Sequence, residues 1–449
     1  MRHTTMSFTA VPKCGQEVLF ASHVGAARFA RNQCLRLVID ALEKKRSDPE
    51  HKIPWSGFDL INAFNQWKRS EDAGFDTQGN PGLPWRKDVS SGVFEESAVD
   101  LGKALKAFSE SRKGQRKGRR VGFPRFQKRG FGRDSCRFRN KGHAVRIDAS
   151  DPQRLYLPKI RWVHLRESTR RLRRLLKRGA KILFVTLRRR AKGWGIAINI
   201  QAPDFCESMQ KPPIRATLGI DRGLKHFAVT ASPSGEHRQR VCSPRPLQHS
   251  LRTLRRLSQA VSRKKKGSKN RFKAARRLAR SHQRIRAQRQ HFLHELSTKV
   301  SKSHAAVVIE DLNVAGMMRN RCLSRHIADA GWAEFARQLR YKCAWYGSTL
   351  VEADRWYPST KTCSACQTVK NEMPLAERTY TCVTCGLRID RDLNAAINLA
   401  KYPSVAKKCL ETKNGCGGVS SGPETLVSAV KLTSMKQQAR GASRQRACV

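Results

Sequence analysis

The stretch that decides the fold is Arg355–Tyr402, which reads RWYPSTKTCSACQTVKNEMPLAERTYTCVTCGLRIDRDLNAAINLAKY. Its two C-x-x-C pairs are separated by 15 residues, a spacing of the four-cysteine zinc class, and four thiolates fill the tetrahedral coordination of zinc. The stretch therefore predicts a structural zinc ribbon without an open position for a reacting water. Redox use of either pair is less favoured, because neither precedes a helix in a thioredoxin-like context. The predicted zinc ligands are Cys363, Cys366, Cys382 and Cys385.

Positive charge dominates the composition. The 449 residues include 90 Lys and Arg against 35 Asp and Glu, which gives a net charge of +55. Self-repulsion of this size requires a polyanionic partner, and nucleic acid is the first candidate. Binding should weaken steeply with salt, because each neutralised phosphate releases counterions.

Two segments, Ser111–Arg133 and Leu251–Gln290, contain no acidic residue. In the first, basic residues alternate with phenylalanines, a pattern that suits phosphate contact with base stacking. The alternative is that the phenylalanines belong to a core and only the charges face solvent. The residues that we predict to contact nucleic acid are Arg119, Arg120, Arg125, Lys128, Arg129, Lys264, Lys265, Lys266, Lys269, Arg276 and Arg277.

Apolar periodicity predicts a multidomain protein of α/β and α+β class. Helical spacing within the first hundred or so residues predicts a helical lobe, and alternating runs up to Ile200 predict a small antiparallel β-domain. Leu251–Gln290 predicts two basic helices that are broken at Gly267-Ser268. The polar, basic segment after Tyr402 predicts a disordered tail.

Three acidic residues have special positions in a chain that is poor in carboxylates. Asp221 and Glu310 each end an apolar strand pattern, and Asp392 stands at the start of a helical one. Carboxylates that converge from strand ends and a helix start can hold two divalent ions for phosphodiester hydrolysis, and hard oxygen ligands favour Mg²⁺ or Mn²⁺. Taken singly, an acid at such a position is more often a surface or capping residue, and Asp311 and Asp390 compete for the same assignment.

Three motifs in order resemble the TnpB family of transposon-encoded, RNA-guided DNA endonucleases, which is related to the type V CRISPR effectors. They are GIDRG at Gly219–Gly223, IEDL at Ile309–Leu312, and the C-x-x-C pairs followed by DRDLNAAINLA at Asp390–Ala400. HVGAARFARN at His23–Asn32 and GFPRF at Gly122–Phe126 extend the resemblance over roughly residues 12 to 400.

The resemblance implies a RuvC nuclease core of RNase H-like fold with an inserted zinc ribbon. Its catalytic, magnesium-binding residues would be Asp221, Glu310 and Asp392, and the family pattern selects Asp392 over Asp390. The implied domains are a wedge-type β-barrel over 1–14 and 119–205, a helical recognition lobe over 15–118, a RuvC-like nuclease over 206–360 and 387–402, the zinc ribbon over 361–386, and the basic tail over 403–449.

The resemblance also implies partners: a guide RNA from the transposon end, and double-stranded DNA that is cut beside a short flanking motif. We expect a monomer with bound RNA in the cytoplasm of a prokaryotic cell, on the nucleoid when it engages DNA. No membrane association is expected, because no apolar run approaches the roughly 20 residues of a membrane span. Two alternatives stay open, a nuclease-inactive RNA-guided regulator of DNA and a DDE-type transposase that joins DNA ends.

Overall fold

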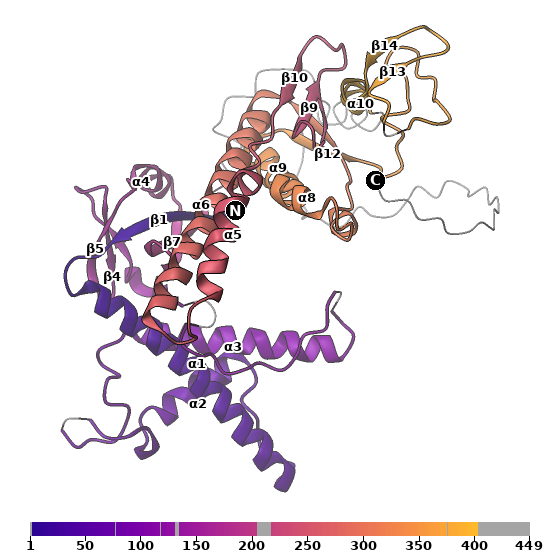
Figure 1. Ribbon diagram of the computed structural model, residues 1–449. Helices are drawn as coiled ribbons and strands as arrows, with labels where there is room; N and C mark the ends of the chain where they lie inside the picture. The colour runs from indigo at the N-terminus through magenta and orange to yellow at the C-terminus, as the bar shows by residue number, and fades with distance from the viewer. Residues whose placement is uncertain are drawn as a thin grey trace, which may run out of the picture. The chain divides into compact units, whose positions relative to one another are not determined.

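In the computed structural model, the described residues form an N-terminal antiparallel sheet with its helices, a second sheet with its own helices, and a small cysteine-bearing ribbon (Figure 1). The predicted tail at 403–449 lies outside the described residues. No helix in the described part of the chain is long and apolar enough to cross a membrane. The described residues are 2–76, 78–116, 118–130, 134–203, 217–374 and 376–402.

The N-terminal sheet has seven antiparallel strands in the order β2-β6-β7-β1-β5-β4-β3. In β7 the residues Trp194, Ile196, Ile198 and Ile200 are all buried, which confirms the predicted antiparallel β-domain. The first strand of the chain lies in the middle of this sheet, between β7 and β5. The strands are β1 (Arg2–Val11), β2 (Ser135–Arg139), β3 (Arg146–Ile147), β4 (Arg154–Leu157), β5 (Arg161–Leu165), β6 (Lys181–Arg190) and β7 (Gly193–Ala202).

Helices are present where the helical spacing of the first hundred or so residues predicts them. These helices share one hydrophobic core with the N-terminal sheet, as the edge-on contact of Phe20 with Trp194 illustrates, with ring centroids 5.2 Å apart. Ser56 and Asp59 form a reciprocal capping box that starts α2. The helices of this half are α1 (Gln16–Ser47), α2 (Gly57–Trp67), α3 (Ser91–Arg112) and α4 (Arg170–Lys177), with short 3-10 turns at Glu71–Ala73 and Lys141–His143.

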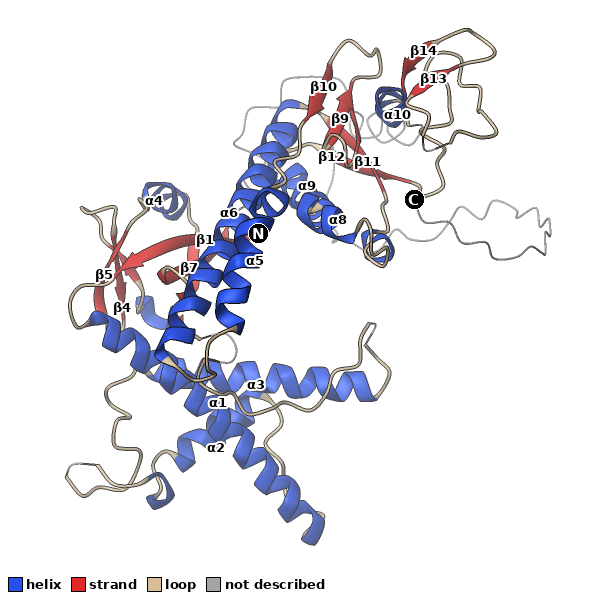
Figure 2. Ribbon diagram, viewed as in Figure 1, coloured by secondary structure: helices blue, strands red, loops and turns tan. Residues whose placement is uncertain are grey.

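The second sheet has five strands in the order β10-β9-β8-β11-β12. Figure 2 labels β9, β10, β11 and β12 of this sheet. Strands β8, β11, β12 and β10 all run in one direction, and β9, which pairs antiparallel with both β8 and β10, runs in the opposite direction. Its core includes Phe227, Leu293 and Phe335. The strands are β8 (Leu218–Asp221), β9 (Ala228–Ala231), β10 (Arg238–Val241), β11 (Ala306–Glu310) and β12 (Thr349–Ala353).

Two basic helices precede β11, as predicted. Ser268 accepts a hydrogen bond from the backbone nitrogen of Arg271 and so starts the second of them, immediately after the predicted break. Three more helices separate β11 from β12. The helices of this region are α5 (Pro246–Ser262), α6 (Lys269–Ser303), α7 (Val314–Met317), α8 (Ser324–Ala330) and α9 (Trp332–Tyr346).

The C-terminal part of the described chain is the cysteine-bearing ribbon followed by one helix. Strands β13 (Thr379–Thr381) and β14 (Arg388–Asp390) pair antiparallel and lead into α10 (Arg391–Ala400). This helix packs against β8 and β9 of the five-stranded sheet, where Leu393, Ala396 and Ile397 contact Val229 and Ala231.

Candidate active site and cysteine ribbon

Asp221 and Glu310 end neighbouring parallel strands. Ile220 of β8 pairs with Ile309 of β11, so the acids that follow them lie side by side at the carboxyl edge of the five-stranded sheet. Asp221 is buried, and Glu310 is half-buried. The carboxyl edge of an open α/β sheet is the usual place for a functional site.

The third acid, Asp392, reaches this edge because α10 packs closely on β8. A Cβ added at Gly219 would lie 2.0 Å from the backbone oxygen of Ala396 and 2.4 Å from the backbone nitrogen of Ala400. Only glycine therefore permits this helix to lie directly on the strand that bears Asp221.

Asp390 and Asp392 have different tasks in the structure. Asp390 is the N-cap of α10: its carboxylate accepts hydrogen bonds from the backbone nitrogens of Asp392 and Leu393, each at 3.1 Å, and it is ion-paired with Arg240. Asp392 lies in the first turn, where it acts electrostatically on Asp221. Glu310 and its neighbour Asp311 also have different tasks, because Asp311 is ion-paired with Arg355. The structure thus brings together the three predicted acids. The two competing acids, Asp390 and Asp311, interact with other residues.

Negative charge accumulates at this edge. Burial, and then the charges of Glu310 and Asp392, raise the pKa of Asp221 well above its usual range, although Arg391 and Arg222 oppose the shift. A divalent cation would compensate this charge. In the described residues, only the four cysteines form a group whose ligand atoms all lie within 4.8 Å of one another. The three carboxylates do not form such a group.

Arg222 is a buried residue that contacts the backbone of Glu310. Its side chain is buried, and one of its terminal nitrogens donates a hydrogen bond to the backbone oxygen of Glu310. Burial lowers the pKa of its guanidinium, whereas Glu310 and Asp221 raise it. Sequence reasoning missed this residue, although its place directly after Asp221 was a signal.

The close approach at Gly219 gives a testable expectation. Gly219→Ala should lower the free energy of unfolding by about 3 kcal/mol, because the new methyl group meets backbone atoms that cannot rotate away. Denaturant unfolding of the full chain measures this change. Gly25→Ala in α1 is the control, since a Cβ there meets nothing within 4 Å, and it should be neutral or stabilising by up to about 1 kcal/mol. Equal losses in both variants would contradict the packing argument.

The cysteine ribbon has the geometry of a tetrahedral metal site. Its four sulfur atoms lie within 4.8 Å of one another, with Cys363 and Cys385 3.6 Å apart and Cys366 and Cys382 3.5 Å apart. Zinc–sulfur bonds of about 2.3 Å place thiolates roughly 3.8 Å apart, so the residues fit this ion. The remaining core of the ribbon is small, with Tyr380 as its largest buried side chain.

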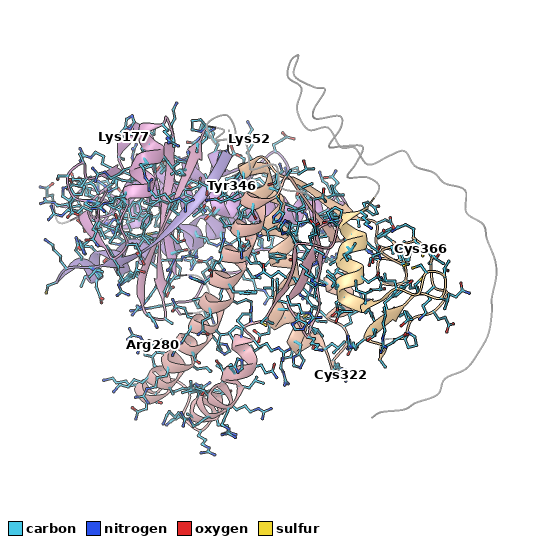
Figure 3. The ribbon with its side chains drawn as sticks, turned by 90° about the horizontal axis from the view of Figure 1, so that it is seen from above. Lys52, Lys177, Arg280, Cys322, Tyr346 and Cys366 are labelled. Atoms are coloured by element: carbon cyan, nitrogen blue, oxygen red, sulfur yellow. The ribbon has the colours of Figure 1, made fainter. Side chains whose placement is uncertain are left out.

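Two asparagines of α10 connect this helix to the ribbon. Figure 3 labels Cys366, which lies in the ribbon beside α10. Asn394 and Asn398 are fully buried. Both donate to the backbone oxygen of Thr362, at 2.7 and 2.6 Å, and Asn394 also accepts from the backbone nitrogen of Ser364 at 3.0 Å. The first cysteine knuckle is thus bonded to the helix that bears Asp392. A signal was present in the sequence, because the two asparagines are spaced i, i+4 on an otherwise apolar helix.

A basic cavity of about 820 Å³ lies between the N-terminal sheet, α1 and α6. This volume is in the range of small-ligand pockets. Phe272 of α6 is 64% exposed at its wall. Arg276 and Arg280, the latter labelled in Figure 3, donate to the backbone oxygen of Ala191 and connect α6 to the β6–β7 turn. The cationic residues that line it are Arg28, Arg31, Lys128, Arg137, Arg188, Arg189, Arg190 and Arg276.

All eleven residues predicted to contact nucleic acid are exposed, but they do not form one surface. Lys128 and Arg276 line the basic cavity, Arg120 lines a separate shallow pocket near Phe108, and four lysines lie at or beside the α5–α6 turn. Of the interleaved phenylalanines, Phe126 is 49% exposed, whereas Phe123 packs on Phe108. The alternative that a phenylalanine belongs to the core and does not stack on a base therefore holds for Phe123. Sequence reasoning missed the cavity arginines of α1 and β6, which are far apart in the chain.

Comparisons with known proteins show the family to which this chain belongs. Residues 198–321 match a family described as "Probable transposase", and residues 332–399 match the "Cas12f1-like, TNB domain". A Mycobacterium tuberculosis protein named "Putative RNA-guided DNA endonuclease" is 34% identical over 89% of this chain and 86% of its own length. A Streptomyces pristinaespiralis protein of the same name is 34% identical over 85% and 84%, and Escherichia coli InsQ is 28% identical over 95% and 99%. These matches place the chain among transposon-associated proteins. It belongs to the TnpB family.

Proposed function

We propose that this protein is an RNA-guided, Mg²⁺-dependent DNA endonuclease of a transposon. The observation on which this rests is the convergence of Asp221, Glu310 and Asp392 at one sheet edge, where burial and the charges of the other two acids raise the pKa of Asp221, in a chain of net charge +55. The order β10-β9-β8-β11-β12, in which β9 alone runs antiparallel to the other four strands, supports an RNase H-like, RuvC-type core. The names of the relatives support guidance by RNA.

The active site would hold Mg²⁺ or Mn²⁺ on Asp221, Glu310 and Asp392, because carboxylate oxygens are the ligands that these ions prefer. When bound, the ions would supply an ionised water as nucleophile and stabilise the leaving oxygen of the phosphodiester. The chain supplies orientation: Arg222 fixes the backbone of Glu310, and Asp390 starts the helix of Asp392. Zinc would occupy Cys363, Cys366, Cys382 and Cys385 as a structural ion.

We assign a wedge-type β-barrel to 1–14 and 119–205, a recognition lobe to 15–118, the nuclease to 206–360 and 387–402, and the ribbon to 361–386. Pairing with the guide would read the DNA sequence, while the protein would read backbone geometry and a short flanking motif. The basic cavity and the exposed residues of α5 and α6 are the surfaces that we propose for the phosphates of guide RNA and DNA.

The test begins with the full-length protein expressed with its transposon end. A discrete RNA should co-purify with it, and that complex should cut a plasmid in Mg²⁺ at a site that moves when the guide segment is changed. Retargeted binding without cutting would replace the proposal by the nuclease-inactive regulator. Joining of transposon ends by RNA-free protein would replace it by the DDE-type transposase.

A further inference from the structure

Ser359 touches the second acid directly. It lies between β12 and the first cysteine knuckle, and it is 3% exposed. Its hydroxyl donates a hydrogen bond of 2.6 Å to Oε1 of Glu310. A hydroxyl can donate one hydrogen bond, and the buried hydroxyl of Ser359 donates this bond to a carboxylate of the proposed active site.

The same residue is also bonded to the helix of the third acid. The backbone oxygen of Ser359 accepts a hydrogen bond of 2.8 Å from Nδ2 of Asn398, and the same amide nitrogen donates to Thr362 in the knuckle. Tyr357, two residues earlier, donates through its hydroxyl to the backbone oxygen of Asn398 at 3.3 Å. Ser359 therefore forms separate hydrogen bonds to Glu310 of β11 and to Asn398 of α10, the helix that bears Asp392.

A glutamate side chain has three rotatable bonds, so a metal-binding glutamate needs a partner that fixes its carboxylate. Hydrogen bonds from residues behind the ligands perform this task in metal sites, and their loss typically costs about 10- to 100-fold in metal affinity or activity. In Glu310 the bond is made to one oxygen, which leaves the other available to a cation.

We propose that Ser359 is a positioning residue: its hydroxyl orients the Glu310 carboxylate toward a divalent cation, and its carbonyl ties that arrangement to the helix bearing Asp392. The inference rests on the proposed function, because it assumes that the three acids bind the cation. Ser359 is not one of the three acids, and its effect on cation binding is exerted through Glu310.

The test measures Mn²⁺ binding by calorimetry on the full-length, zinc-loaded protein freed of RNA. Ser359→Ala should raise the dissociation constant about tenfold relative to wild type. Ser359→Thr, which keeps the hydroxyl, should stay near the wild-type value. In the RNA complex, Ser359→Ala should raise the Mg²⁺ concentration for half-maximal cleavage by a similar factor and leave the KM for DNA unchanged.

Ser348→Ala is the matched control. Ser348 is also buried, it precedes β12 at the opposite end of the strand, and its hydroxyl donates only to the backbone oxygens of Ser301 and His304. This variant should lose stability but bind Mn²⁺ like the wild type. Retained zinc in Ser359→Ala verifies that the ribbon is folded.

The outcomes separate the inference from the function on which it rests. Wild-type Mn²⁺ affinity in folded Ser359→Ala, beside clearly weakened binding in Asp221→Asn, would overturn the positioning role and leave the proposed metal centre intact. Unchanged Mn²⁺ binding in Asp221→Asn would overturn the metal centre itself.

Discussion

Asp221→Asn should lose DNA cleavage and yet unfold at a higher temperature than the wild type in buffer without Mg²⁺. The loss follows because a metal ligand disappears. Several kcal/mol of transition-state stabilisation, or about 10³-fold in rate, depends on the bound ions. The gain follows because burial and two neighbouring acids oppose the ionised form of Asp221, and an amide of the same shape carries no charge.

The two effects are measured on the same preparation. Single-turnover plasmid cleavage in Mg²⁺ gives the rate, and thermal unfolding gives the stability. The unfolding buffer must contain no chelator, because a chelator would remove zinc from the ribbon. Added Mg²⁺ should stabilise the wild type by binding to the native state, and it should stabilise the variant less.

Asp390→Asn is the control for this prediction. Asparagine is as good an N-cap as aspartate, so α10 should remain intact, and the exposed ion pair with Arg240 contributes little. This variant should cut DNA at close to the wild-type rate. Undiminished cleavage by Asp221→Asn would refute the acid assignment, and a loss of cleavage in Asp390→Asn as large as that in Asp221→Asn would transfer the third position from Asp392 to Asp390.

Much of this site could be predicted because its signals are local. The two C-x-x-C pairs, the acids at the ends of apolar strands and the alternation in β7 each occupy a few consecutive residues. The structure confirms the strands and places Asp221 beside Glu310 as the parallel pairing of β8 and β11 requires. The choice of Asp392 over Asp390 depended on family resemblance, and the structure adds that the Asp390 carboxylate caps α10.

The parts that could not be predicted depend on contacts between distant segments. Strand β1 inserts between β5 and β7, more than a hundred residues away, and nothing in its own ten residues specifies that position. Ser359 looks like an ordinary loop serine until Glu310 is beside it. The arginines of the basic cavity come from α1, β2, β6 and α6, so charge runs in the sequence locate only some of them.

Cys382→Ser should release zinc and lower the cleavage rate by about 10²-fold or more, although none of the four cysteines lies among the acids. Without the ion, the small core around Tyr380 cannot fold the knuckles. Loss of Thr362 would then leave the buried amide of Asn394 unsatisfied, at about 1–3 kcal/mol, and the amide of Asn398 would keep only its bond to Ser359, so α10 would shift. A displacement of about 1 Å at Asp392 is enough for such a loss of rate.

The control for the ribbon is Cys322→Ser, which changes an exposed free thiol in the described chain and should preserve both zinc and cleavage. Zinc content by mass spectrometry and single-turnover cleavage are measured on both variants. Guide-RNA binding should persist in Cys382→Ser, because the proposed RNA surfaces lie on other elements. A zinc-free Cys382→Ser protein that cuts at the wild-type rate would contradict the coupling, since the asparagine bonds to Thr362 would then have no effect on the position of Asp392.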